Sequence, residues 1–392
     1  MRTIGVVTVA RSDYGIYQPL LRRIQGDAEL QLALFVTGMH LAPEFGLTVK
    51  GIEADGFDIA AKIEMLVSSD TPEGIAKSIG LGLIGFAQAY STCRPDILIV
   101  LGDRFEMMAA ALAALPFNIP VAHIHGGEVT RGAIDEAMRH SITKLSHHHF
   151  VSTAEYARRV AQLGEEPWRI TTSGAPSLDN LETVTLLPPG ELNSRFGLKI
   201  DKAPLLVTFH PVTLEYEQTE WQIAELLAAL EQVDLPAIFT SPNADTNGRL
   251  IIHRLKEFVD KHPKAQVVDN LGTEGYFSLM SMASAMVGNS SSGIIEAASF
   301  KLPVVNIGTR QEGRARTVNV IDVGYKRGDI LSGVRTAVSP EFRQTLHNLV
   351  NPYGQGTASQ SIVDKLKSIE LNQELIMKRF HDISVAAGAK SS

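Results

Sequence analysis

The sequence is poor in the features that make disulfide frameworks and membrane anchors. Its 392 residues include a single cysteine, Cys93, which excludes an intrachain disulfide and a zinc site built from cysteines. No apolar run approaches the roughly 18 residues that a membrane span needs. The apolar stretch at the N-terminus is interrupted at Arg11, too early for a signal peptide. We therefore expect a cytoplasmic protein without a membrane partner.

Positive charge is also scarce. The chain has 36 Lys and Arg against 43 Asp and Glu, a net charge of −7, and a pI of about 6.0. No basic run stands out, so we do not expect nucleic acid as a partner. If the ligand is an anion, local arginines must hold it against the field of the whole molecule.

What the chain does have is a regular alternation of Val/Ile/Leu runs with amphipathic stretches, which predicts parallel sheets covered by helices. In the first half this pattern predicts strands at 3–10, 30–38, 96–103, 120–127 and 148–153. It predicts helices near 15–25, 74–91, 105–115, 133–146 and 153–163. A polar segment with Pro and Gly, 181–204, interrupts the pattern and is interpreted as a linker.

The alternation then restarts, with strands predicted at 204–211, 237–242, 265–270, 285–289, 302–308 and 320–324. The last forty residues look purely helical. The chain is too long for one hydrophobic core, so we predict two doubly wound, Rossmann-like α/β domains, 1–185 and 186–365. In such folds ligands bind at the carboxyl ends of strands, here in the cleft between the domains.

Two predicted strands of the first half are followed by residues that could bind a ligand or take part in catalysis. Arg11 lies where a loop opens a helix, a good position for binding an anion, although it could equally be a surface charge beside an Asp13 N-cap. Asp103 and Arg104 follow another strand. They could be an acid/base group with its positioning cation, or a structural ion pair.

Residues 123–150 hold six of the twelve histidines together with Glu128, Asp135 and Glu136. One interpretation is a metal site, since His123 and His125 are two apart in a strand and face the same side. A catalytic zinc ion needs a third ligand and usually spaced partners such as HExxH, which is absent. His147, His148 and His149 would alternate faces. We therefore predict no metal here.

The alternative interpretation makes the carboxylates the working groups. Acidic residues are common in the first turn of a helix because of the helix dipole. However, the three carboxylates of this stretch come just after a strand end and are predicted to face Asp103 one strand away. Crowded like charges raise at least one pKa, as general acid/base chemistry requires. His123, His125 and His140 could tune these pKa values.

The second half carries a pattern typical of a nucleotide site. His210 and Asn243 each follow a predicted strand. Ser290, Ser291, Ser292 and Gly293 open a predicted helix, where free N–H groups and hydroxyls make a phosphate cradle. Glu296, one turn on, could bind both ribose hydroxyls. The next strand leads to Arg310 and Arg314, which would face the same crevice.

These residues occur in an ordered set of motifs: RSDYG, GDRFE, HIHGGEVTRGAIDEAMRHSITKLSHHHF, FHP, PNADTNG, GNSSSGIIEA and GTRQEGR. Over about residues 1–370 the chain resembles the hydrolysing UDP-N-acetylglucosamine 2-epimerases of bacterial sialic and legionaminic acid pathways. The resemblance implies a glycosyltransferase-B fold, with C-terminal helices (366–392) packing back on the first domain. It also implies a homodimer or homotetramer and a reaction that uses no metal and no cofactor.

The resemblance implies conversion of UDP-N-acetylglucosamine and water to N-acetylmannosamine and UDP, by elimination to a 2-acetamidoglucal and hydration. Asp103, Glu128 and Asp135 would be the acid/base set, with Glu136 able to replace Asp135. The groups expected to stabilise the diphosphate are Arg11, Arg104, His210 and Arg310; those expected to hold phosphate, ribose or the cleft wall are Ser290, Ser291, Glu296 and Asn243. Two alternatives stay open: the same reaction on a nucleotide-linked 2,4-diacetamido-2,4,6-trideoxyglucose, or a glycosyltransferase of the same fold.

Overall fold

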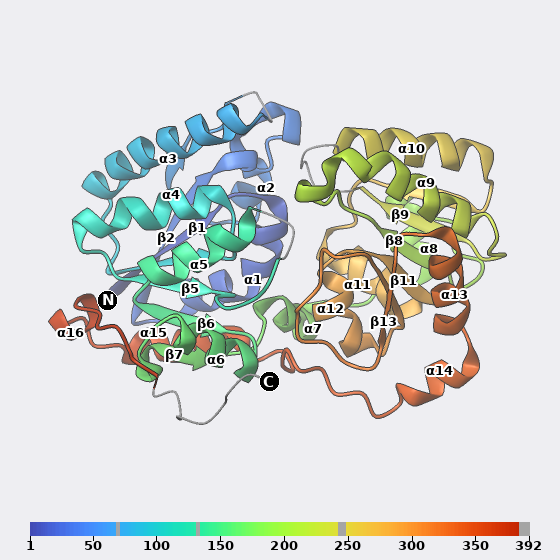
Figure 1. The fold of residues 1–392 in the computed structure, drawn as a ribbon. Coiled ribbons are helices and arrows are strands. Elements are labelled where there is room, and N and C mark those ends of the chain that lie inside the picture. Colours follow the sequence, from blue (N-terminus) through green and yellow to red (C-terminus); the bar gives the residue numbers. More distant parts are fainter. Residues whose placement is uncertain (68–70, 131–133, 242–247, 384–392) are drawn as a thin grey trace. The chain divides into compact units, whose positions relative to one another are not determined.

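The computed structural model describes residues 1–67, 71–130, 134–241 and 248–383, and the chain divides into two compact units (Figure 1). Unit 1 contains Met1–Glu128, Ala137–Gly174 and Thr357–Ser392. Unit 2 contains Val129–Glu136 and Ala175–Gly356. The chain therefore leaves unit 1 after Gly174 and returns to it at Thr357.

Unit 1 is built on a parallel sheet of seven strands in the order β3-β2-β1-β4-β5-β6-β7. The strands are β1 Arg2–Thr8, β2 Leu30–Thr37, β3 Ile59–Ile63, β4 Ile97–Leu101, β5 Val121–Ile124, β6 His148–Val151 and β7 Ile170–Thr172. The central strands β4 and β5 are buried at every position, as their unbroken apolar sequences predict. The strand order reverses between β1 and β4, so their carboxyl ends flank a topological switch point.

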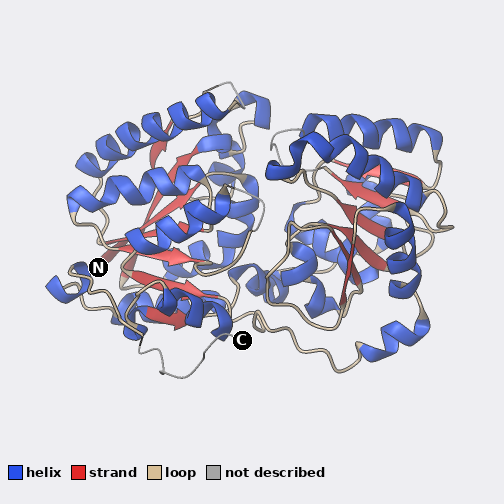
Figure 2. Ribbon diagram, in the orientation of Figure 1, coloured by secondary structure: helices blue, strands red, loops and turns tan. Residues whose placement is uncertain are grey.

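Helices pack against both faces of this sheet (Figure 2). They are α1 Arg11–Gly26, α2 Val49–Ala54, α3 Pro72–Thr92, α4 Phe105–Ala114, α5 Asp135–Leu145, α6 Ala154–Gln162, α15 Ala358–Ser368 and α16 Gln373–Ile376. The first two residues of α5 group with unit 2 and the rest with unit 1.

Unit 2 repeats the plan with six parallel strands in the order β10-β9-β8-β11-β12-β13. The strands are β8 Leu205–Thr208, β9 Ala237–Thr240, β10 Ala265–Val268, β11 Ala285–Gly288, β12 Val304–Ile307 and β13 Val320–Val323. Alternate residues of β8 enter different cores: Leu205 and Val207 pack in one apolar cluster and Leu206 in another. Both faces of the sheet are therefore covered. The switch point lies between β8 and β11.

The helices of unit 2 are α7 Asn180–Thr183, α8 Pro189–Phe196, α9 Thr219–Leu230, α10 Gly248–Lys261, α11 Gly272–Met282, α12 Ser292–Ile295, α13 Arg327–Ala337 and α14 Pro340–Thr345. None of the helices in the described part of the chain is long and apolar enough to cross a membrane.

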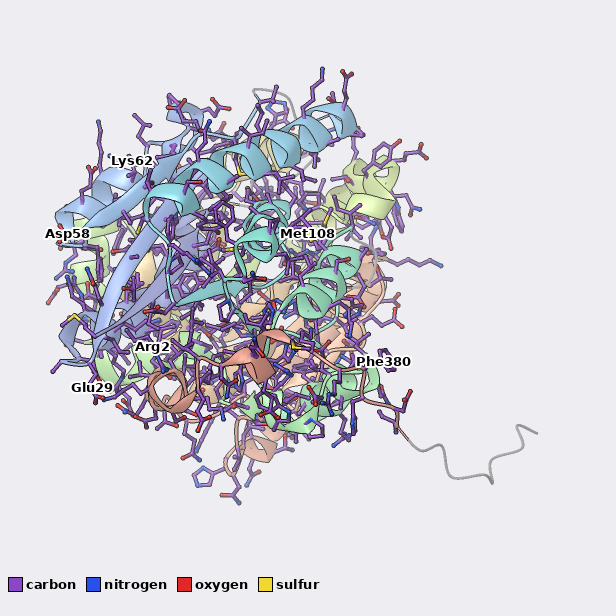
Figure 3. All side chains as sticks on the ribbon, turned by 90° about the vertical axis from the view of Figure 1, so that its left-hand side faces the viewer. Arg2, Glu29, Asp58, Lys62, Met108 and Phe380 are labelled. Atoms are coloured by element: carbon purple, nitrogen blue, oxygen red, sulfur yellow. The ribbon has the colours of Figure 1, made fainter. Side chains whose placement is uncertain are left out.

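The C-terminal return to unit 1 is held by charged and apolar contacts. Arg2 donates to the carbonyl oxygens of Leu366 and Lys367 at the end of α15. Lys367 in turn pairs with Glu29 at 2.6 Å, on the side of unit 1 where Figure 3 labels Arg2 and Glu29. Ile362 and Leu366 are fully buried in the core of unit 1.

The predicted strands and helices are present, and one prediction needs correction. The additions are the strands β3 and β7 and the helices α2, α7 and α8, the last two at the segment interpreted as a linker. The strands β3 and β7 were not predicted, because both lie at sheet edges, where exposed positions interrupt the apolar run. At the β3 edge, Lys62 pairs with Glu53 at 2.6 Å, and such an edge lysine discourages further strand pairing. The last forty residues are not purely helical, since Ile369–Asn372 separate α15 from α16 and Met377–Ile383 are irregular.

Candidate active site

Asp103 lies at the carboxyl end of β4, directly after Gly102, whose φ of 75° turns the chain out of the sheet. Its carboxylate accepts a hydrogen bond from Arg139 of α5. Arg139, only 3% exposed, also donates to the carbonyl oxygen of His125 at 2.8 Å. A single buried guanidinium therefore joins the ends of β4 and β5.

Glu128 lies just past the end of β5 and is 2% exposed. Its Oε1 is 2.6 Å from His125 Nδ1 and accepts the Ser152 hydroxyl at 2.7 Å. His125 has a φ of 65°, a left-handed conformation unusual for a residue other than glycine. A side chain at Gly127 would lie 2.7 Å from the Tyr156 carbonyl oxygen, so only glycine fits there. The strained turn places Glu128 against two polar partners.

His123 lies in β5 and supports the end of the neighbouring strand β4. Its Nε2 is 2.7 Å from the carbonyl oxygen of Gly102, so this nitrogen must carry the proton. Its Nδ1 lies 3.2 Å from the Thr143 hydroxyl. Burial lowers the pKa of His123 to about 3, which keeps the ring neutral. His123 thus fixes the backbone from which Asp103 projects.

The histidines at the start of β6 have three separate partners. His147 Nδ1 accepts a hydrogen bond from the Val121 amide at 3.1 Å. His148 Nε2 is hydrogen-bonded to the Thr171 hydroxyl at 3.0 Å, and His149 Nε2 to the Glu165 carboxylate at 2.9 Å. Within the described residues no group of three His, Cys, Asp or Glu is arranged to hold a metal ion. These rings act as scaffold.

Asp13 is a carboxylate whose position the sequence did not reveal. The alternative in which Asp13 is an N-cap is wrong: Ala10 is the N-cap of α1, and Asp13 is buried in the first turn. Its Oδ2 has no hydrogen-bond partner within the described part of the chain. Burial raises its pKa to about 6, with Arg104 opposing the rise and Glu106 and Asp103 adding to it.

The two predicted arginines of unit 1 differ in setting. Arg11, the first residue of α1, is exposed. Arg104, the N-cap of α4, is partly buried and donates Nε and Nη2 to the carboxylate of Glu106, at 3.2 and 3.1 Å. Glu106 is itself fully buried. The guanidinium of Arg104 is therefore held in one orientation.

In unit 2, His210 follows β8 and Asn289 follows β11, the two strands of the switch point. The Asn289 side chain accepts from the His210 amide at 2.7 Å and donates to the His210 carbonyl at 2.8 Å. The backbone carbonyl of Asn289 accepts from Arg310 Nη1 at 3.1 Å and from Gln311 Nε2 at 2.8 Å. His210 and Arg310 are thus both hydrogen-bonded to Asn289.

The serine-rich segment differs from its prediction in one respect. The helix it opens, α12, has only four residues and is followed by a 3-10 turn, so its dipole is small. Ser290, Ser291 and Ser292 are partly exposed, and the Ser290 hydroxyl accepts from the Ser292 amide at 3.3 Å. Any cradle here therefore depends on hydroxyl and N–H groups more than on a helix dipole.

Glu296 is the C-cap of α12, not a residue inside a longer helix. It is 7% exposed, and its Oε1 accepts the Ser177 hydroxyl. Tyr276 of α11 lies beside Ser290, Ser292 and Glu296, and burial raises its pKa to about 12. Gly293 packs tightly on β12, where a Cβ would lie 2.9 Å from a valine methyl group.

Three further predicted residues, Asp135, Glu136 and Arg314, belong to unit 2. Asp135 and Glu136 open α5, and Glu136 Oε2 accepts from the Thr130 amide at 2.6 Å. Arg314 Nε donates to the Val129 carbonyl at 2.9 Å. Asn243 lies outside the described residues.

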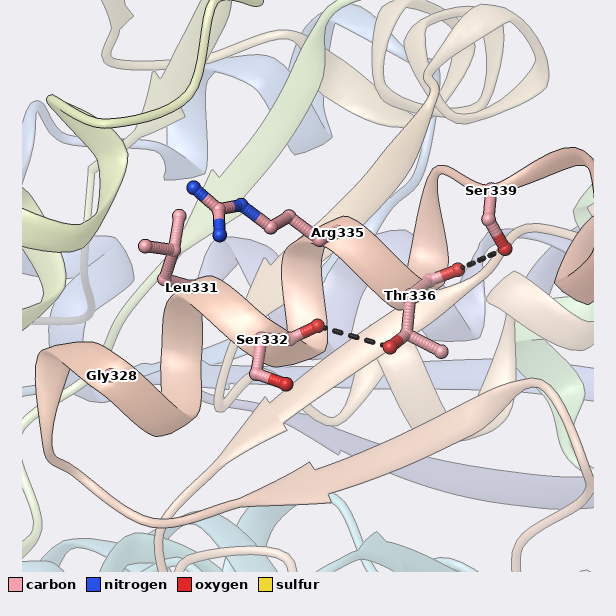
Figure 4. A pocket seen from close by; sticks show the side chains of 6 residues that line it. All are labelled: Gly328, Leu331, Ser332, Arg335, Thr336 and Ser339. Carbon is pink, nitrogen blue, oxygen red and sulfur yellow. Dashed lines mark hydrogen bonds between the residues drawn. The ribbon is translucent and has the colours of Figure 1, made fainter.

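A surface pocket is present elsewhere in unit 2, along α13 (Figure 4). The hydroxyl groups of Thr336 and Ser339 in its lining donate to the carbonyl oxygens of Ser332 and Thr336. None of the predicted site residues lines this pocket.

Comparison with known proteins decides between the families that share this fold. The family model described as UDP-N-acetylglucosamine 2-epimerase matches residues 22–367. The chain belongs to this family. It is 39% identical over 379 residues to the UDP-N,N'-diacetylbacillosamine 2-epimerase (hydrolyzing) of Legionella pneumophila, covering 96% of this chain and 99% of that protein. It is 41% identical over 385 residues to the GDP/UDP-N,N'-diacetylbacillosamine 2-epimerase (hydrolyzing) of Campylobacter jejuni, with 97% and 99% covered.

The fold of this epimerase family member is also found in solved structures. The crystal structure of the UDP-GlcNAc 2-epimerase from Neisseria meningitidis bound to UDP-GlcNAc superposes with a TM-score of 0.81 at 18% identity, covering 94% of this chain and 100% of that one. The expected glycosyltransferase-B type of fold, with two parallel sheets and alternating helices, is therefore confirmed.

Sequence reasoning missed the residues that hold the predicted ones in place. Arg139, Ser152, Ser177, Tyr276 and Asn289 each contact or lie beside a predicted residue. Asn289 had a usable signal, because it directly precedes the three serines and directly follows a predicted strand. Arg139 and Ser177 had none, since their partners lie 36 and 119 residues away in the sequence.

Proposed function

We propose that this epimerase hydrolyses a UDP-linked 2,4-diacetamido-2,4,6-trideoxyglucose, also called N,N'-diacetylbacillosamine, and inverts the sugar at C2. The observation that carries the reaction type is the pair of carboxylates at neighbouring strand ends of unit 1, Asp103 and Glu128, each held by buried polar partners. General acid/base groups must be positioned in this way to act on a bound substrate.

The proposed reaction has two stages. A carboxylate removes the proton from C2 while the C1–O bond to UDP breaks, which leaves a 2-acetamidoglucal. Water then adds its hydroxyl at C1, and a proton returns to C2 from the opposite face, so that substrate and water give the 2-epimer and UDP. This sequence needs at least two proton-transfer groups, which Asp103, Glu128 and either Asp135 or Glu136 would supply. Each is worth roughly 10²–10⁴ in rate.

Unit 2 would bind the nucleotide. His210 and Arg310 are held together by Asn289 and would bind the diphosphate. Arg11 and Arg104 keep the role of phosphate-binding residues that the sequence predicts. Donors aimed at the leaving diphosphate stabilise the charge that develops as the C1–O bond breaks. The groups that would hold phosphate, ribose and the neighbouring backbone are Ser290, Ser291, Ser292, Gly293, Glu296 and Arg314.

The choice of sugar rests on the relatives. Two relatives, with 39% and 41% identity, match nearly the whole chain, and both are named diacetylbacillosamine 2-epimerases. A second candidate is UDP-N-acetylglucosamine, favoured by a 30% identical relative from Neisseria meningitidis with that name. The two sugars differ at C4 and C6, whereas the reaction takes place at C1 and C2. The same chemistry therefore serves either sugar.

The deciding experiment presents each UDP-sugar to the enzyme in D₂O and follows the products by NMR, without any acceptor. We expect free 2-epimerised sugar with deuterium at C2, formed faster from the diacetamido sugar. Faster turnover of UDP-N-acetylglucosamine would reverse the choice of sugar. Product without deuterium at C2 would contradict proton abstraction there. Asp103→Asn is the matched control and should bind UDP but incorporate no deuterium.

A further inference from the structure

Asn289 links two loops that are far apart in the sequence. It is 0% exposed and directly follows β11. Its backbone N–H donates to the Thr208 carbonyl at 3.1 Å, and its side-chain amide then forms both bonds to His210. The amide thus continues the pairing of β8 with β11 beyond the last strand residue.

The same residue holds Arg310. The backbone carbonyl of Asn289 accepts from Arg310 Nη1 and from Gln311 Nε2, which uses both of its lone pairs. Gln311 is 1% exposed, so this second bond is shielded from water. Movement of Asn289 would therefore displace His210 and Arg310 together.

We propose that Asn289 is the positioning residue of the nucleotide site, holding His210 and Arg310 in the spacing that a nucleoside diphosphate requires. This inference rests on the function proposed above. Asparagine suits the role because the His210 backbone presents one donor and one acceptor, and only a carboxamide of this length answers both. Aspartate has no donor for the His210 carbonyl, and alanine has neither group.

The positioning role of Asn289 should affect a nucleoside diphosphate but not an uncharged nucleoside. Burial, together with the charge of Arg310, holds the pKa of His210 well below its usual value, so its imidazole is neutral. The two groups therefore supply a hydrogen bond and a full charge. Both are suited to phosphate oxygens, and neither is required by an uncharged nucleoside. Loss of Asn289 should therefore weaken binding of UDP but leave binding of uridine unchanged.

The test measures the affinity of UDP by calorimetry and that of uridine by ligand-detected NMR, using the full-length protein. For Asn289→Ala we expect UDP affinity to fall roughly 10-fold or more, as for a buried polar group that loses its partners. Asn289→Asp should lose more, because it places a negative charge near the diphosphate while nearly preserving shape. Uridine affinity should stay within about twofold in both variants.

Asn319→Ala is the matched control. Asn319 is 1% exposed in the same unit and makes comparable bonds, to the Leu302 carbonyl at 2.9 Å and from the Thr317 hydroxyl at 3.0 Å. It lies at the amino ends of β12 and β13, opposite to the proposed site. We expect a similar loss of stability with unchanged UDP affinity.

The outcomes separate this inference from the proposed function. If the wild-type protein does not bind UDP, the proposed function fails. If the wild-type protein binds UDP and both Asn289 variants bind it equally well, only the positioning role is overturned. That role is also overturned if uridine and UDP weaken alike, or if Asn319→Ala weakens UDP binding as much as Asn289→Ala.

Discussion

A single residue of this epimerase can lower the free energy of unfolding because of where it is buried. Asp13 is the clearest case, because its carboxylate is buried in the first turn of α1, near the charges of Asp103 and Glu106. Desolvation and two like charges disfavour its ionised form, and the Arg104 guanidinium offsets only part of this. A group that destabilises its own fold is expected where function requires a charge or a movable proton.

Replacing Asp13 by Asn should stabilise the protein at neutral pH. The folded-state pKa, about 6, lies above the ordinary value of 3.8, so ionisation costs folding free energy as pH rises from 4 to 6. Asn mimics the neutral acid. We expect Asp13→Asn to unfold at higher urea concentration at pH 7.5, by up to about 3 kcal/mol, and to match wild type at pH 4.

Asp201→Asn, at an exposed bend, serves as the control and should change the free energy of unfolding by less than about 0.5 kcal/mol at either pH. A pH-independent effect of Asp13→Asn would show that a contact, and not ionisation, decides its stability.

At the scale of elements, the ends of strands carry the proposed chemistry because glycines allow the chain to leave the sheet abruptly. Gly102 does so directly after β4, and Gly288 does so as the last residue of β11. At Gly288 φ is 136°, and a Cβ would lie only 1.9 Å from the Thr208 carbonyl oxygen. The close approach brings Asn289 to His210.

Gly288→Ala should therefore destabilise unit 2 and weaken UDP binding. Strain at this φ, with overlap against β8, should cost at least about 2 kcal/mol, measured by urea unfolding. The control is Gly190→Ala in α8, where a Cβ meets nothing within 4 Å and ordinary helix propensity should add up to about 1 kcal/mol of stability. Equal stability of the two variants would refute this account.

At the scale of the whole molecule, the chain closes unit 1 only after unit 2 has been completed. The α15 helix, which begins at Ala358, contributes Ile362 and Leu366 to the core of unit 1, and Arg2 bonds to its last turn. Unit 1 is therefore assembled from both ends of the sequence, and its stability depends on residues more than 300 positions apart.

Leu366→Ala tests this dependence. The side chain is 0% exposed, so we expect a loss of about 2–5 kcal/mol in the free energy of unfolding. Hydrogen exchange followed peptide by peptide should show lost protection in unit 1 and retained protection in unit 2. Leu371→Ala, at a side chain 45% exposed, should change neither. Equal loss of protection in both units would mean that they unfold as one.

The sequence by itself determined the α/β class, the central strands and the strand-end positions of Asp103, Glu128 and His210. These follow from local patterns: continuous apolar runs, and polar residues that directly succeed them. The edge strands β3 and β7 escaped prediction because partial exposure removes that signal.

Only the tertiary structure decided which hydrogen-bond partners position the candidate site residues. Arg139 reaches Asp103 across 36 residues, Ser177 reaches Glu296 across 119, and Asn289 reaches His210 across 79. It also decided that Asp13 is buried and that His123 fixes a carbonyl group. Hydrogen bonds and burial of this kind depend on which strands become neighbours, and a parallel sheet with its crossovers brings together residues that no local pattern connects.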